Sequence, residues 1–211
     1  METSGAGRGK MPVRVATRPD LDGVTETVWA AFREDPLWSW AFPDPGAMRP
    51  WWRFLIASAL RYPSVFVAGE YAAVSVWIPA GGSELTDREE AQLEPLLAEL
   101  LDTRAPDVLE LLDRFEASHP RDRPHYYLSL LGTHPDHRGG GLGMQLLAEN
   151  LDRMDALGIP AYLESSNPAN DPRYERLGFR RIGEFSTPDG SRVVGTMWRE
   201  PGASGVRPYG Q

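Results

Sequence analysis

A glycine-rich run between an apolar segment and an amphipathic segment is the feature that most constrains this chain. The apolar segment, YYLSLLGT (residues 126–133), predicts a buried strand, and the glycine run PDHRGGGLG follows at residues 135–143. Over residues 144–158, apolar side chains continue at spacings of three and four, which predicts a helix with one apolar face. That face comprises Leu142, Leu146, Leu147, Leu151, Met154 and Leu157. The glycines therefore connect a strand to a helix.

The start of this helix is expected to bind an anion. The first turn of a helix has unpaired N–H groups and the positive end of the dipole. The glycines leave the backbone open to a diphosphate, and Arg138 adds a fixed positive charge. A dinucleotide fingerprint would need a further glycine at position 144 or 146, and a P-loop would need Gly-Lys-Ser/Thr. Neither is present, so the loop is of another kind.

A second motif follows at residues 161–179, AYLESSNPANDPRYERLGF. It reads as a short strand, a turn and a very short helix that has Pro172 in its first turn and Gly178 at its end. The first motif, Arg-x-x-Gly-x-Gly after Thr-His-Pro, resembles the acyl-CoA pyrophosphate loop of the GCN5-related N-acetyltransferases (GNAT). The second, YERLGF, resembles the next motif of that family. The resemblance covers residues 12–200 and is greatest to puromycin N-acetyltransferase-like members.

The resemblance implies an α/β (α+β) GNAT fold, a mixed, largely antiparallel sheet of about seven strands with helices on both faces. Residues 13–20 alternate like a half-buried strand, and Asp20 is expected to cap the helix that follows. A helix over 49–62 leads into two strands. After Phe179, two further strands flank a Pro-Asp-Gly turn and close the sheet.

A helical insert is expected between the third and fourth strands, over residues 81–124. Thr86 and Glu89 form a capping box, and Pro95 should kink or restart the helix. A second amphipathic helix is marked by Val108, Leu109, Leu112 and Phe115. The insert is either a surface helical pair or a cover over the acceptor site. We expect a disordered N-terminus (1–10), a single domain (11–201) and a flexible tail (202–211).

Composition limits the classes of function. The absence of cysteine excludes disulfides, thiolate metal sites and an acyl-cysteine intermediate. The net charge of -8 argues against nucleic-acid binding, which depends on clustered basic residues, and suits a cationic substrate better. No apolar run resembles a signal peptide or a membrane span, so we expect a cytoplasmic protein without a membrane partner. A monomer and a homodimer are both compatible with the sequence.

The resemblance implies acetyl-CoA as co-substrate and no metal. Its diphosphate would meet the glycine loop, and its acetyl-pantetheine arm would meet the end of the buried strand. Asparagines in the turn of the second motif could bond the same molecule, although asparagine is also an ordinary turn residue and helix cap. The expected contacts are Leu131, Gly132, Thr133, Arg138, Gly139, Gly140, Gly141, Leu142, Gly143, Met144, Asn167 and Asn170.

The catalytic candidates are Tyr174 and Glu164. Tyr174 matches the family tyrosine that protonates the departing sulfur, and an ordinary tyrosine, with a pKa of about 10, is protonated at neutral pH. Otherwise it would be a packing residue. Glu164 could accept the proton of the amine directly or through water, or it could be a surface carboxylate at a strand end. Glu34 is the alternative base.

The segment from Arg33 to Gly46 is the candidate acceptor site. Trp38 and Trp40 either pack in the core or, with Glu34 and Asp35 adjacent, line a pocket for an aromatic or cationic amine. The function implied is acetylation of the primary amine of a small molecule, such as an antibiotic or another natural product. The alternatives are a protein acetyltransferase, acting on an N-terminus or a lysine, and a non-catalytic acyl-CoA-binding module.

Overall fold

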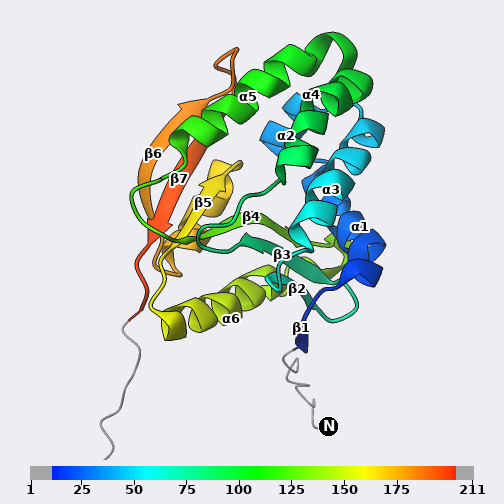
Figure 1. Ribbon diagram of the computed structural model, residues 1–211. Helices are drawn as coiled ribbons and strands as arrows, with labels where there is room; N and C mark the ends of the chain where they lie inside the picture. Colours follow the sequence, from blue (N-terminus) through cyan, green and yellow to red (C-terminus); the bar gives the residue numbers. More distant parts are fainter. Residues whose placement is uncertain (1–10, 203–211) are drawn as a thin grey trace, which may run out of the picture.

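The computed structural model describes residues 11–202, which form a seven-stranded sheet with helices on both faces (Figure 1). The strand order is β1-β2-β3-β4-β5-β7-β6, and β4 with β5 is the parallel pair among antiparallel neighbours. The expected mixed fold is therefore confirmed, with the insert between β3 and β4. The elements are β1 (Val13–Val15), α1 (Leu21–Phe32), α2 (Pro36–Ala41), α3 (Pro45–Ala59), β2 (Val65–Ala68), β3 (Ala73–Ile78), α4 (Asp87–Leu101), α5 (Ala105–Ser118), β4 (Tyr126–Thr133), α6 (Leu142–Leu157), β5 (Ala161–Ser165), α7 (Asp171–Glu175), β6 (Arg180–Ser186) and β7 (Val193–Arg199).

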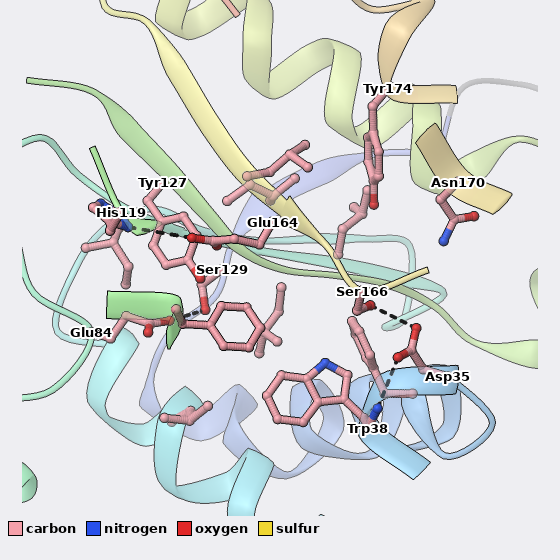
Figure 2. A pocket seen from close by; sticks show the side chains of 18 of the residues that line it. Asp35, Trp38, Glu84, His119, Tyr127, Ser129, Glu164, Ser166, Asn170 and Tyr174 are labelled. Carbon is pink, nitrogen blue, oxygen red and sulfur yellow. Dashed lines mark hydrogen bonds and ion pairs between the residues drawn. The ribbon is translucent and has the colours of Figure 1, made fainter. Parts of the chain in front are cut away.

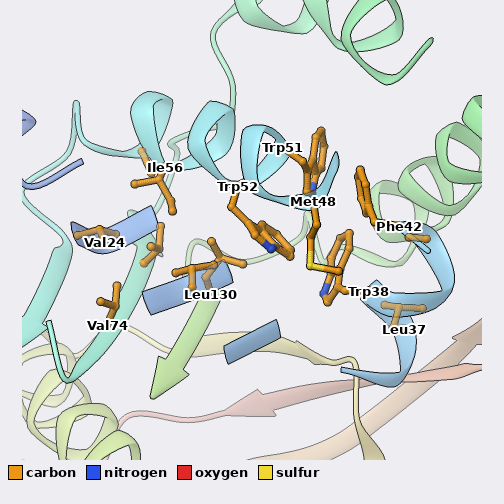
Figure 3. Close-up of a cluster of buried hydrophobic side chains, with 14 of the residues drawn as sticks. Val24, Leu37, Trp38, Phe42, Met48, Trp51, Trp52, Ile56, Val74 and Leu130 are labelled. Atoms are coloured by element: carbon orange, nitrogen blue, oxygen red, sulfur yellow. The ribbon is translucent and has the colours of Figure 1, made fainter. Parts of the chain in front are cut away.

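Each face of the sheet has its own hydrophobic core. On one face, helices α1 to α5 enclose a cluster that contains Trp38, Trp51 and Trp52 (Figure 3). On the other, α6 packs Leu146 and Leu147 against the sheet. Leu157, predicted to share that apolar face, is 62% exposed because it lies in the last turn, beyond the sheet. Within residues 11–202, no helix has the length and apolar character needed to cross a bilayer.

Asp20 does not cap α1, contrary to the prediction from its position. Its carboxylate accepts hydrogen bonds from Arg14 at 2.9 and 2.6 Å and from the Tyr71 hydroxyl at 2.7 Å. It also accepts from the Thr17 backbone at 2.7 Å. The strand before it is correspondingly short, because the chain turns back at Thr17 to make these bonds. Asp20 therefore joins β1 to the loop between β2 and β3.

The segment from Arg33 to Gly46 contains the short helix α2. Asp35 accepts the N–H groups of Leu37 and Trp38 at 3.0 and 3.2 Å and so caps α2, which begins at Pro36. Asp44 caps α3 in the same way. This helix begins at Pro45, four residues before the predicted start at Arg49. A proline in the first turn of a helix loses no intrahelical hydrogen bond, so these prolines begin helices instead of breaking them.

The helical insert has its predicted capping box, and its first helix does not restart at Pro95. Thr86 and Glu89 exchange hydrogen bonds at 3.3 and 2.9 Å at the start of α4. The helix then continues through Pro95 and ends at Leu101, and the capping residue that follows, Asp102, has a φ of 47°. Contacts of α4 with α3 and α5 offset the hydrogen bond that Pro95 removes. The insert therefore packs on the helical layer above β3.

The parallel pair β4 and β5 separates along its length. The strands pair at Tyr126 with Ala161, Tyr127 with Tyr162 and Leu128 with Leu163, whereas β4 continues to Thr133. Beyond Leu128 the edge of β4 that faces β5 lacks a strand partner. The expected splay in the sheet is thus present, and it opens beneath α2 and α5.

Candidate active site

A cavity of about 1540 Å³ lies at the separation of β4 and β5. Its wall begins at the glycine loop before α6, follows the free edge of β4 and the end of β5, and reaches α5 in the insert. Figure 2 shows Tyr174 entering this space from one side and Glu164 extending toward His119 on the other. The cavity therefore joins both sequence motifs to the helical insert.

The glycine loop presents an open helix N-terminus to the cavity. Gly139 and Gly141 adopt left-handed φ angles of 84° and 74°, and a Cβ at either would have no neighbour within 4 Å. Gly141 caps α6 without a side-chain hydrogen bond, and the first turn contains no acidic residue. The helix itself offers no partner to the N–H groups of Leu142, Gly143 and Met144. This geometry fits a diphosphate.

Close packing keeps this helix end beside β4. A Cβ built on Gly143 would lie 2.5 Å from Thr133 Oγ1, so a larger residue would push α6 away from the strand. Arg138 is exposed and donates a 3.0 Å hydrogen bond to the Ala31 carbonyl at the end of α1. Arg138 thus lines the same cavity as the start of α6.

The pairing of β3 with β4 determines which backbone groups face the cavity. The His134 N–H donates to Ala72 at 3.0 Å, and Gly132 is in register with Val74. Because N–H groups alternate between the two edges of a strand, Gly132 points toward β3, whereas Leu131 points into the splay. Of the three predicted contacts on this strand, Leu131 and Thr133 line the cavity and Gly132 does not.

Tyr174 lies half-buried in α7 at the cavity wall, with its ring edge-to-face on Phe179 at 6.2 Å between centroids. Burial, together with the charges of Asp35 and Asp171, raises the pKa of Tyr174 to about 12. The hydroxyl therefore stays protonated at neutral pH and can donate a proton.

Glu164 is buried, although its position at a strand end also allowed a surface carboxylate. Its side chain is 2% exposed, and one oxygen lies 3.8 Å from His119 Nδ1. The other oxygen is buried without a hydrogen-bond partner in the described chain. Among the described residues, Glu164 has no Lys or Arg partner, and such a buried carboxylate in a cavity is suited to accept a proton or to bind a cation.

Glu84 is a cavity residue that sequence reasoning missed. It accepts a hydrogen bond from Ser129, and burial, with the charge of Glu164, raises the pKa of Glu84 to about 7. Burial of the Tyr127 hydroxyl, together with the charges of Glu164 and Glu84, raises the pKa of Tyr127. The sequence signal near Glu84 was the capping box that begins at Thr86, which predicts a helix but not a buried carboxyl group.

Asp35 was expected beside the aromatic pocket together with Glu34, but Glu34 was the residue chosen for the site. The Asp35 carboxylate caps α2, accepts a 2.9 Å hydrogen bond from Ser166, and has a pKa raised by burial. Glu34 is 74% exposed and lies at the rim of the cavity. The Asp-Pro pair at 35–36 was the available signal for a helix cap.

Most of the predicted contacts line the cavity, with three exceptions. Trp38, Asn167 and Asn170 do so, and Trp38 also packs edge-to-face on Trp52 at 4.7 Å. The exceptions are Gly132, which packs against α1, Gly140, and Trp40. Trp40 lies outside because its Nε1 donates to Asp189 at 2.8 Å and the Arg104 guanidinium covers its ring.

Comparison with known proteins agrees with this architecture. The model of the acetyltransferase (GNAT) family matches residues 108–179, which include the insert helix α5, the glycine loop and α7. Resemblance to puromycin N-acetyltransferase-like members in particular is not confirmed and remains a prediction.

Three solved structures illustrate the fold. A Corynebacterium glutamicum structure, described as histone acetyltransferase HPA2 and related acetyltransferase, is 24% identical, with a TM-score of 0.65 over 93% of this chain and 99% of that chain. Arylalkylamine N-acetyltransferase 2 from Aedes aegypti is 18% identical, with a TM-score of 0.69 over 91% and 99%. Drosophila melanogaster polyamine N-acetyltransferase, which forms N-acetylagmatine, is 19% identical, with a TM-score of 0.64 over 90% and 99%.

At these identities the neighbours show the fold alone, so the assignment depends on the family match. That match covers the two motifs that shape the cavity. The family match over residues 108–179 and the fold of residues 11–202 together support an acetyltransferase of the GNAT type that uses acetyl-CoA as the acetyl donor.

Proposed function

We propose that this enzyme acetylates the primary amine of a small cationic molecule. The observation that carries the proposal is one continuous cavity with an open helix N-terminus in one wall and buried carboxylates, with aromatic rings, in another. The first wall suits an anionic donor and the second suits an amine.

The donor side fits acetyl-CoA. When bound, this co-substrate supplies an acetyl group activated as a thioester. The diphosphate would be held by the N–H groups of Leu142, Gly143 and Met144, with Arg138 beside them. The other contacts proposed on this side are Leu131, Thr133, Gly139, Gly141, Asn167 and Asn170, all at the cavity wall.

Acetyl transfer requires stabilisation of the carbonyl oxygen, protonation of the departing sulfur and deprotonation of the acceptor amine. The cavity offers a group for each. The Leu131 N–H faces the splay and can stabilise negative charge that develops on the carbonyl oxygen. Tyr174 can protonate the departing sulfur, since burial keeps its hydroxyl protonated. Glu164 can accept the proton that the ammonium form of the acceptor must lose before it attacks.

The acceptor side favours a small molecule with positive charge. Glu84, Glu164 and Asp35 all contribute to the cavity, and among the described residues none of the three forms an ion pair with Lys or Arg. Trp38 and Phe115 add aromatic surface. Residues of α4 and α5 line the same chamber, which supports the insert as part of the acceptor site. The neighbours that act on polyamines and arylalkylamines support an amine acceptor as well.

The test is an acceptor panel assayed by CoA release, with products identified by mass. It would include monoamines, diamines, arylalkylamines, amino antibiotics and peptides with a free N-terminus or lysine. The proposal expects turnover with small amines and little with peptides. Preferential turnover of peptides would reassign the enzyme to protein acetylation, and acetyl-CoA binding without any turnover would indicate a binding module.

Tyr174→Phe tests the catalytic assignment within the same assay. It keeps the ring on Phe179 and removes only the hydroxyl, so kcat in single turnover should fall by about 10²- to 10⁴-fold with unchanged acetyl-CoA affinity. A near-normal single-turnover rate would assign protonation of the sulfur to water.

A further inference from the structure

Two histidines form a chain that ends at Glu164. His125 Nδ1 lies 2.8 Å from the Arg123 carbonyl oxygen, and His125 Nε2 lies 3.0 Å from His119 Nε2. The remaining nitrogen of His119, Nδ1, faces Glu164 at 3.8 Å, as Figure 2 shows. The catalytic scheme above does not use either histidine.

The hydrogen-bond partners fix where the protons are. A carbonyl oxygen only accepts, so His125 Nδ1 must carry the hydrogen. Burial lowers the pKa of His125, which keeps the ring neutral and leaves Nε2 as an acceptor. The short contact between the rings then requires the hydrogen on His119 Nε2. In neutral His119, Nδ1 therefore has no hydrogen, and its lone pair is available on the side of Glu164.

Neighbouring aromatic rings pack against both histidines and hold them in the chain. His119 packs edge-to-face on Tyr127 at 4.9 Å and on Tyr162 at 5.0 Å between centroids. His125 packs on Trp198 at 5.1 Å and is 8% exposed. The side chain of His119 is 26% exposed and lines the cavity, so it is the member of the chain that can exchange with water.

We propose that Glu164 and His119 form one proton-accepting unit for the acceptor amine, and that His125 is the positioning residue that keeps His119 Nδ1 unprotonated. The proposal rests on the proposed function, because it concerns the same reaction. In two steps, an ammonium N–H breaks as an O–H forms on Glu164, and that O–H then breaks as Nδ1–H forms on His119. The unit gains one proton, and water at the exposed edge of His119 takes it away.

The surroundings favour the added positive charge. A carboxylate next to the unit stabilises an imidazolium, and Glu84 interacts electrostatically with both His119 and Glu164. The titratable groups that face the unit from the neighbouring elements are Glu84, Glu116, Asp122, His125, Tyr127 and Tyr162.

The experiment compares His125→Phe with His125→Gln. The phenylalanine keeps the aromatic packing but removes the acceptor for His119 Nε2–H, so the Nδ1–H tautomer, which bonds Glu164, takes over. The glutamine can still accept through its amide oxygen. In His125→Phe the proton acceptor would be the Glu164 carboxylate alone, without the imidazole of His119.

We expect the acid limb of the kcat/KM profile to move to lower pH in His125→Phe, because a carboxylic acid is in general a stronger acid than an imidazolium. The plateau should fall by about 10²-fold. Acetyl-CoA affinity should not change. His125→Gln should restore the acid limb. A purely structural His125 would lower the melting temperature in either variant and leave the acid limb in place, which would overturn the proposal.

Nitrogen NMR of His119 in the resting enzyme separates this proposal from the proposed function. The proposal predicts a protonated Nε2 and an unprotonated Nδ1 in the wild type, with the reverse in His125→Phe. The wrong tautomer would overturn the relay even if amines are acetylated. The right tautomer in a protein that acetylates nothing would overturn the function and leave the histidine chain as a structural feature.

Discussion

The Ser166 hydroxyl donates a 2.9 Å hydrogen bond to the Asp35 carboxylate and thereby joins the segment after β5 to the cap of α2. The same carboxylate accepts two backbone N–H groups of α2 and contributes to the field at Tyr174. One buried acid thus connects the acceptor wall to the proposed general acid.

Asp35→Asn should move the basic limb of the activity profile to lower pH. Burial is the main cause of the raised Tyr174 pKa, and Asp35 is the next. Tyr174 donates only while protonated, and activity is lost as pH rises through its pKa. Removing the Asp35 charge lowers that pKa, so the loss begins earlier. The measurement is single-turnover rate against pH, with Glu175→Gln, an exposed residue of the same helix, as the control. An unmoved basic limb in Asp35→Asn would remove Asp35 from the electrostatics of Tyr174.

The elements of the fold were predictable because they follow local patterns. The strand over 126–133 has the predicted limits, and α6 begins two residues before the predicted start. The two strands around the Pro-Asp-Gly turn and the Thr86 capping box were also recognised correctly. Each depends on residues that are close in the sequence, and no distant contact overrides them.

The acidic side of the site was less predictable because long-range packing creates it. Glu84 is polar and flanked by loop residues, and it becomes buried only when α4 and α5 fold over β4. Trp40 follows an alternating aromatic pattern with Trp38, but α2 turns the two side chains in different directions, since positions two apart on a helix do not share a face. Helix formation at Pro36 was the step that sequence reasoning missed.

Asp20→Asn should destabilise the protein at neutral pH but much less in acid. Arg14, Tyr71 and Thr17 bond its carboxylate, and the Arg14 guanidinium foremost holds the pKa of Asp20 well below its usual range. A group with a lowered pKa stabilises the fold above its unfolded pKa, near 4, and the contribution is lost as pH falls through the folded value. Denaturant titrations at several pH values measure it. Asp22→Asn, whose side chain is 83% exposed, is the control and should change stability little at any pH. A penalty for Asp20→Asn that stays constant down to the lowest accessible pH would contradict this account.

Asn150→Ala should destabilise the sheet–helix interface by about 1 to 3 kcal/mol. The buried Asn150 Oδ1 accepts hydrogen bonds from Ser75 at 2.6 Å and from the Trp77 indole at 3.0 Å. Alanine would leave both donors buried without an acceptor. Gln145→Ala removes an exposed amide from the same helix and should cost less than about 0.5 kcal/mol. Equal losses in urea unfolding would show that the buried amide adds nothing specific.

The central claim is that acetyl-CoA binds at the N-terminus of α6, and calorimetric titration of acetyl-CoA into Gly141→Asp and Gly158→Asp tests it most directly. Both glycines have left-handed φ angles, 74° and 66°, and neither has a neighbour within 4 Å of a built Cβ, so the backbone cost should be similar, about 1 kcal/mol. They lie at opposite ends of the same helix. An aspartate at 141 would place negative charge among the N–H groups that should hold the diphosphate, and affinity should fall by about 10- to 100-fold. Gly158→Asp should bind as the wild type does. Equal affinities in the two variants, with both folded, would contradict the placement of the donor and the account of the cavity built on it.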